Sequence, residues 1–128
     1  MAALSNYLEN KLLDATLNNT AFTSPATVYA ALFLTDPTDD GSGTEVNGVS
    51  YTRVAMPFGA ASSGTSLNSS VVQFDQATTD WGTISYFALF DASTGGNLLY
   101  HGALTLPKTI STGDVFQFAI SSVSISLA

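Results

Sequence analysis

The fold depends first on the stretch Trp81-Gly-Thr-Ile-Ser-Tyr-Phe-Ala-Leu-Phe-Asp91, because this run combines aromatic with β-branched residues and ends in a turn. Successive side chains of a β-strand point to opposite faces of its sheet. From Tyr86 to Phe90 both sets of alternating positions are apolar, which predicts a central strand buried on both faces. The Gly-rich residues 92–96 follow, and we expect residues 97–104 to return as the partner strand of a hairpin.

Shorter apolar runs on either side of this hairpin predict further strands. Residues 27–34 are apolar on both faces, residues 50–57 end in a proline, and residues 71–74 form a short strand. In the final run, residues 116–127, the apolar positions change from even to odd numbers at Ser121-Ser122. This change predicts either a bulge or a crossing between two sheets.

The segments between these runs carry the residues of turns and loops. Residues 36–45 combine acids with proline and glycine, which indicates an exposed loop. Residues 59–70 are rich in Gly, Ser, Thr and Ala, and we interpret them as a long surface loop or a mobile connection. Residues 107–114 are typical of a turn.

One helix is predicted, at residues 5–17. Asn6 followed by Glu9 resembles a capping box, and Ser5 is the competing N-cap residue. With these segments, the sequence predicts a mainly β protein: an antiparallel, jelly-roll-like β-sandwich at about residues 27–127 with one N-terminal helix, all within a single domain of residues 1–128.

The predicted helix carries two apolar stripes. One stripe consists of Leu4, Leu8, Leu12 and Ala15, and Leu13 and Leu17 lie well around the helix from it. Two alternatives remain open. Either both stripes form one wide face that packs on the domain's own sheet, or Leu13 and Leu17 contact a neighbouring subunit.

Composition excludes several classes of function. The net charge is −7, and the three cations, Lys11, Arg53 and Lys108, are too scattered to neutralise a row of phosphates, so we expect no nucleic acid partner. Ser and Thr make up about a quarter of the chain and charged residues only 10%, which favours self-association through an uncharged surface. The absence of cysteine excludes disulfides and thiolate chemistry. We also expect no signal peptide and no membrane contact.

Few residues suggest chemistry. His101 is the only histidine, and no nucleophile motif accompanies it, so we predict a structural or inter-strand role. Residues 59–64 lack the Gly-Lys-Ser/Thr ending of a phosphate-binding loop. The sequence therefore predicts no catalytic residue and no cofactor.

Acidic residues leave one alternative open. Asp36, Asp39, Asp40 and Glu45 could bind Ca²⁺, but their spacing differs from that of an EF-hand and suits an ordinary solvated loop, which is the interpretation we prefer. Asp75 and Asp80 form a weaker pair still. The sequence therefore predicts no metal site.

The chain also resembles a family of small tailed-phage virion proteins of the tail-fibre or decoration type. The resemblance runs nearly end to end, and it is carried by residues 4–13, 22–29, 32–37, 43–45, 77–87, 90–92 and 95–99, including Leu-Ser-Asn-Tyr-Leu-Glu-Asn-Lys-Leu-Leu from Leu4 and Phe-Thr-Ser-Pro-Ala-Thr-Val-Tyr from Phe22. The Ser-rich residues 121–128 depart from the family pattern.

This resemblance implies a non-enzymatic component of the virion. The function we predict is a capsid cement or decoration protein that stabilises the head shell, with the major capsid protein and further copies of itself as partners. The alternative is a tail-fibre or tail-adaptor component. A cyclic homotrimer is the preferred assembly, because it would match the local threefold positions of an icosahedral shell. Leu13 and Leu17 are the candidate subunit contact.

Overall fold

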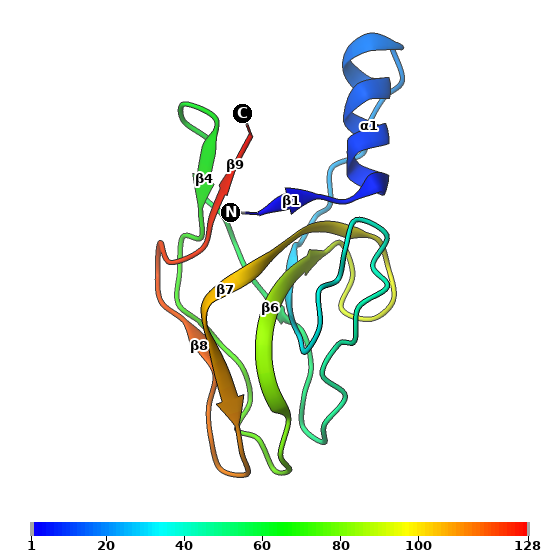
Figure 1. Cartoon of the computed structure of the whole chain (residues 1–128). Coiled ribbons are helices and arrows are strands. Elements are labelled where there is room, and N and C mark those ends of the chain that lie inside the picture. Colours follow the sequence, from blue (N-terminus) through cyan, green and yellow to red (C-terminus); the bar gives the residue numbers. More distant parts are fainter. Residues whose placement is uncertain (1, 128) are drawn as a thin grey trace.

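The structure of this protein, a computed structural model, describes residues 2–127 and consists mainly of antiparallel β-strands with one α-helix (Figure 1). The predicted fold class, mainly β with one N-terminal helix, is confirmed. The elements in chain order are β1 (Ala3–Leu4), α1 (Asn6–Leu17), β2 (Tyr29–Phe33), β3 (Val54–Ala55), β4 (Thr65–Leu67), β5 (Val72–Gln73), β6 (Gly82–Phe90), β7 (Leu98–Ile110), β8 (Gln117–Phe118) and β9 (Ser124–Ser126).

The main sheet has five strands in the order β1-β7-β6-β2-β3, and all neighbouring pairs are antiparallel. The strand predicted to be central, β6, lies in the middle of this sheet. Its hairpin partner β7 pairs with it from Leu98, opposite Phe90, to Ile110, opposite Gly82. The predicted central hairpin is therefore confirmed.

A second layer faces the main sheet and consists of two small sheets, β5–β8 and β4–β9. The principal core lies between the two layers, because buried residues of both contribute to one apolar cluster. Its most deeply buried large side chains include Leu32, Met56, Phe74, Ile84 and Leu89. The second layer is thus divided between two short ribbons, whereas a continuous sheet would be typical of a sandwich.

The opposite face of the main sheet is covered as well. A smaller cluster there contains Ala31, Phe33, Ala88, Phe90 and Leu98. The rings of Phe33 and Phe90 are stacked with centroids 6.1 Å apart. Alternate residues of β2 and β6 therefore reach two different apolar clusters, which is the burial on both faces that their sequences predict.

Two connections differ from the prediction. Residues 59–70 are not wholly a loop, because β4 lies within them and pairs with β9. Residues 107–114 are not wholly a turn, because β7 continues to Ile110 and the turn follows, closed by a bond from Asp114 N to Ser111 O. Pro107 is tolerated in β7 since residues 104–107 have no partner in the register with β6, so the missing N–H breaks no ladder bond.

The predicted change of face at Ser121-Ser122 is a crossing between sheets. β8 pairs with β5, whereas β9 pairs with β4 in a different sheet. Ser121 adopts a φ of 60°, in the left-handed region, where the chain turns between the two. Phe118 and Ile125 thereby both reach the core although they stand at positions of opposite parity.

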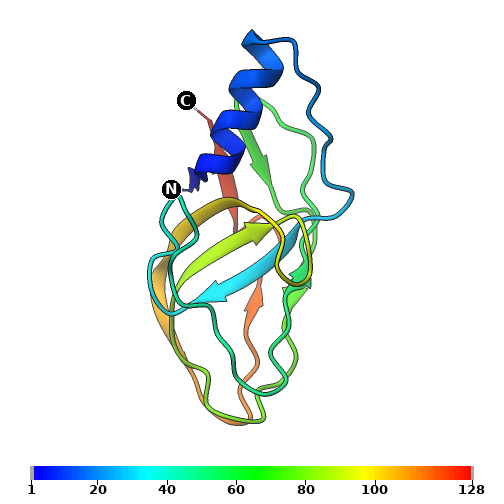
Figure 2. The same ribbon diagram turned by 90° about the vertical axis from the view of Figure 1, so that its right-hand side faces the viewer.

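Helix α1 begins after Ser5, not after Asn6. The Ser5 side chain accepts a hydrogen bond from the backbone N–H of Leu8 at 3.1 Å, as an N-cap residue does, so the competing cap is the correct one. The helix ends at Asn18, whose N–H donates to Asp14 O. Figures 1 and 2 show the helix rising from the end of the main sheet and extending away from it.

Candidate functional site

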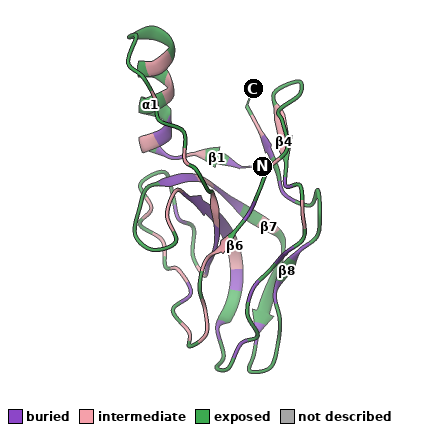
Figure 3. Cartoon of the chain, turned by 180° about the vertical axis from the view of Figure 1, so that it is seen from behind, coloured by how far each residue is buried: buried purple, intermediate pink, exposed green. Residues whose placement is uncertain are grey.

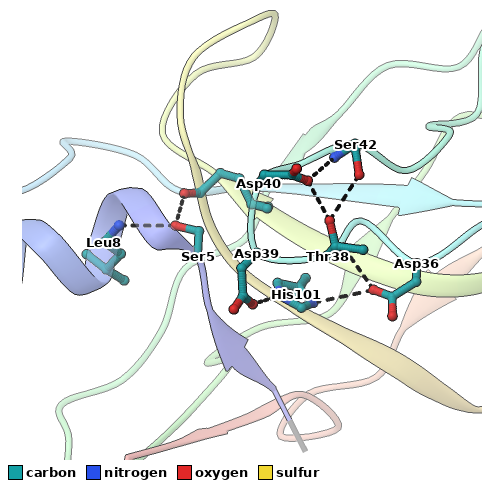
Figure 4. Close-up of polar contacts among 9 residues, drawn as sticks. Ser5, Leu8, Asp36, Thr38, Asp39, Asp40, Ser42 and His101 are labelled. Carbon is teal, nitrogen blue, oxygen red and sulfur yellow. Dashed lines mark hydrogen bonds and ion pairs between the residues drawn. The ribbon is translucent and has the colours of Figure 1, made fainter.

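The base of α1 is attached to the sheet through a small polar cluster (Figure 4). Ser5 is buried, its hydroxyl donates to Leu98 O, and its N–H donates to Leu99 O at 2.9 Å. One residue on, the Asn6 N–H donates to Asp39 O at 2.9 Å. The start of the helix is therefore held by both β7 and the acidic loop.

His101 lies at the centre of this cluster and is buried, with 9% of its surface exposed. Its Nε2 lies 2.8 Å from Asp39 Oδ1, and its Nδ1 lies 3.8 Å from Asp36 Oδ1. His101 belongs to β7, and its partner in the neighbouring strand β1 is Ala3. The histidine thus links β7 to the acidic loop, in agreement with the structural role predicted for it.

The acidic loop is therefore more tightly held than an ordinary solvated loop. Pro37, which belongs to this loop, is fully buried, and Asp40 accepts hydrogen bonds from the Ser42 N–H at 3.0 Å and from the Thr38 hydroxyl. These hydrogen bonds lower the pKa of the Asp40 carboxyl. Sequence separation hid this anchoring, because Asp39 and His101 are 62 positions apart.

The four acids predicted as possible calcium ligands do not converge. Asp36 and Asp39 face His101, Asp40 faces its own loop, and Glu45 pairs with Arg53 at 2.9 Å. Within residues 2–127 there is no group of three or more His, Asp or Glu side chains placed to hold a metal ion.

Across the same residues, no helix is long and apolar enough to cross a membrane.

Arg53 connects Glu45 to the hairpin turn after β6, next to the smaller apolar cluster that contains Phe90. Its guanidinium forms two bonds to the Glu45 carboxylate, and Nη1 donates to Ala92 O and Gly95 O at 3.0 and 2.8 Å. The guanidinium carbon lies 3.7 Å from the centre of the Phe90 ring, where a cation–π interaction forms. The hairpin turn after β6 is therefore fixed by a buried cation.

Tyr51 extends this network into the core. Its hydroxyl donates to Glu45 Oε2 at 2.7 Å and accepts from the Leu32 N–H at 3.0 Å. Burial, reinforced by the adjacent Glu45 carboxylate, raises the pKa of the Tyr51 hydroxyl well above its ordinary value. Burial also raises the pKa of Tyr100.

These raised pKa values predict a loss of stability in alkali. The folded state holds its tyrosine protons more tightly than the unfolded chain, whose tyrosines titrate near pH 10, so the stabilisation is complete below about pH 10 and falls as the pH rises above it. Tyr51→Phe should flatten this fall, although it loses two hydrogen bonds at neutral pH. Urea unfolding between about pH 8 and 12 measures the slope, and an equal slope in both proteins would contradict this assignment.

The exposure of the side chains of α1 distinguishes between the two alternatives for its apolar stripes. Leu8 is the only buried residue of the helix, so the alternative in which one wide face packs on the domain's own sheet is wrong. Leu13 and Leu17 are 55% and 80% exposed and stand one turn apart. Figure 3 shows exposed residues along most of the helix. The sequence therefore identified two apolar side chains that the described chain leaves uncovered.

The remaining sites singled out in the sequence show no joint arrangement. Asp75 and Asp80 are both exposed, and Asp80 accepts from the Thr112 N–H at 2.8 Å. Residues 59–64 lead into the tight connection before β4 and are exposed. The sequence offered Ser5 as the competing N-cap residue, but it gave no sign of the hydrogen bond from the Ser5 hydroxyl to Leu98 O that attaches the helix to β7.

Comparison with known proteins agrees with the phage resemblance. No curated protein matches the chain. The family model described as podophage GP4 fiber I protein gp80 matches residues 3–126, which is nearly the whole chain and includes every strand and the helix. The chain therefore belongs to the podophage GP4 fiber I protein gp80 family and is a structural component of a phage virion.

Proposed function

We propose that this protein is a non-enzymatic subunit of a phage fibre and that it works by binding other subunits. The observation that carries the proposal is the exposed apolar pair Leu13 and Leu17 on a helix that extends away from the main sheet, in a member of a family described as fibre proteins. The capsid cement function stays a prediction, and the family description fits the fibre alternative at least as well.

Physical chemistry supports a binding role for α1. A helix of 12 residues is marginal in water when isolated, and most helices in proteins are stabilised by packing an apolar face. In this protein Leu8 is the only buried residue of α1, and Leu12 and Ala15 on the same stripe are half-buried. A partner that covers Leu13 and Leu17 would supply the missing contact and remove two large apolar side chains from water.

The contact can be tested with a double substitution. Leu13→Ser/Leu17→Ser should reduce association of the purified protein, measured by sedimentation, while the β-sheet circular dichroism stays unchanged, because both side chains are exposed in the single chain. Lys11→Ser, on a different side of the same helix, is the matched control. Loss of fold together with association would place the two leucines in the domain's own packing and reject the contact.

Phage particles that lack this protein would show where in the virion it acts. For a fibre subunit, such particles should keep the thermal stability of their heads and lose attachment to the host. For a capsid cement protein, heads should break at lower temperature while attachment persists. The second result would reject the fibre proposal in favour of the cement alternative. The homotrimer remains a prediction that a mass measurement of the intact assembly tests.

A further inference from the structure

The strand pair β4–β9, which we call the ribbon, projects from the same end of the molecule as α1 (Figures 1 and 2). The edge of β4 that faces away from β9 is partly covered by the residues that precede β4 in the chain. The Gly59 N–H donates to Leu67 O at 2.9 Å, and bridges join Phe58 to Asn68 and Ser62 to Thr65. The free edge of the ribbon is therefore the outer side of β9.

The register shows which backbone groups lie on that free edge. Leu127 N donates to Gly64 O and Asn68 N donates to Val123 O, so Val123, Ile125 and Leu127 direct their backbone groups toward β4. In an antiparallel ladder the intervening residues point the other way. The N–H and C=O groups of Ser124 and Ser126 therefore face away from β4.

Ser124 and Ser126 line an open groove of about 600 Å³ between β9 and β7, and Ala2, directly before β1, lines the same groove. Apolar side chains line it from β6, β8 and the segments next to β8 and β9, among them Phe87, Phe116, Phe118 and Val123. A strand laid along β9 could bond to the backbone of Ser124 and Ser126 and cover part of this apolar lining.

The two walls of the groove differ in how they are protected against strand pairing. A register shift in the pairing of β6 with β7 leaves residues 104–107 without partners in β6; Lys108 lines this wall, and Pro107 stands directly before it in the strand. A bulge, a proline and a lysine are the usual devices that block edge pairing. β9 has none of them: its residues Ser124, Ile125 and Ser126 are uncharged and regular. Among residues 2–127, the β9 wall is therefore the one without such protection against pairing.

The distribution of charge favours a second copy of this chain as the occupant. The chain carries a net charge of −7, so two copies repel each other over most of their surfaces. Residues 54–74 and 115–127, which include β4, β8 and β9, contain no charged residue. The ribbon is thus the part of an acidic protein that an identical acidic protein can approach without repulsion.

We propose that β9 pairs with β9 of a second copy in an antiparallel, two-fold arrangement centred on Ile125. Ser124 then lies opposite Ser126 of the second copy, and each such pair exchanges both backbone hydrogen bonds. The ribbons join into one sheet of order β4-β9-β9-β4. This contact is separate from that of Leu13 and Leu17, and it does not depend on where in the virion the protein lies.

The test uses the full chain carrying Leu13→Ser/Leu17→Ser, so that any contact through α1 is absent. In this background the protein should sediment at twice the monomer mass. Adding Ser126→Pro, which removes an outward N–H and the hydroxyl contact with Thr65 but leaves the backbone bonds to β4 in place, should return it to the monomer mass. Adding Ser124→Lys should do the same by protecting the edge with a charge. Ser111→Lys, on the exposed turn after β7, is the control and should leave the dimer unchanged.

Hydrogen exchange provides a second readout that does not depend on the variants. Protection of the Ser124 and Ser126 amides should rise with protein concentration, whereas that of the Ile125 amide should not. A monomer at every concentration, a mass of three copies, or a dimer that survives both substitutions with unchanged circular dichroism would overturn the proposal. None of these results would change the fibre assignment, which is tested on phage particles.

Discussion

Replacing Phe74 by alanine is expected to lower the free energy of unfolding by about 3–5 kcal/mol, the typical effect of removing a buried aromatic ring. Phe74 is 1% exposed and lies at the centre of the aromatic core. Its ring stacks on Tyr51 with centroids 6.1 Å apart and meets the rings of Phe116 and Phe118 edge-on at 5.9 and 6.3 Å. The cavity would open between the two layers, where the second layer consists only of short ribbons that depend on this packing.

Urea unfolding followed by tryptophan fluorescence measures this cost, since Trp81 is buried in the same cluster. Val71→Ala is the matched control, because Val71 stands three positions earlier and is 54% exposed, so its truncation should change stability by less than about 0.5 kcal/mol. A cost below about 1 kcal/mol for Phe74→Ala would show that the layers do not pack around this ring.

Replacing Arg53 by methionine is expected to cost about 3 kcal/mol, the order found when one partner of a buried ion pair is removed. The side chain of Arg53 is 9% exposed, and its loss would deprive the carbonyls of Ala92 and Gly95 of the guanidinium donor and leave the Glu45 carboxylate with the Tyr51 hydroxyl alone. The cation–π contact with Phe90 would be lost as well.

Arg53→Lys distinguishes the geometry of the guanidinium from its charge. A lysine keeps the charge but cannot bond to the carboxylate through two nitrogens and to the loop carbonyls at the same time, so we expect it to restore less than half of the lost stability. Lys108→Met is the control for loss of a cation elsewhere, because Lys108 is exposed. Full stability in the lysine variant would show that charge alone matters at this position.

Local sequence was sufficient for the elements whose own residues determine them. The run from Tyr86 to Phe90 is apolar at every position, as in a strand covered on both faces, and its aromatic residues and the Gly-rich turn after it favour a strand over a buried helix, so β6 and its hairpin could be predicted. The same holds for the change of face at Ser121-Ser122, since side-chain alternation cannot change parity within one regular strand.

Elements that depend on distant partners could not be predicted in this way. β4 contains only Thr65, Ser66 and Leu67, a composition that also suits a loop, and it becomes a strand because β9 lies beside it. Residues 107–110 contain a proline and resemble a turn, but residues 108–110 pair with Gly82, Thr83 and Ile84 of β6 and so belong to β7. In both cases long-range pairing outweighed local preference.

The candidate site shows the same division. The spacing of Leu13 and Leu17 indicated a second apolar stripe, because helical periodicity is visible in sequence, but it left open whether the domain's own sheet or a neighbouring subunit covers that stripe. The free edge of β9 was not visible, since its three residues resemble any Ser-rich segment until the register assigns their backbone groups a direction. The long uncharged stretches at residues 54–74 and 115–127 were the only sequence signal of that surface.

The position of this protein in the intact virion tests the account most directly. Electron cryomicroscopy of virions, with the five-stranded sheet and the projecting helix α1 fitted into the map, should place copies of the chain in a fibre, with Leu13 and Leu17 covered by a neighbouring subunit. Copies arranged regularly over the head shell, with the fibres lacking this chain, would contradict the proposed function and support the capsid cement alternative.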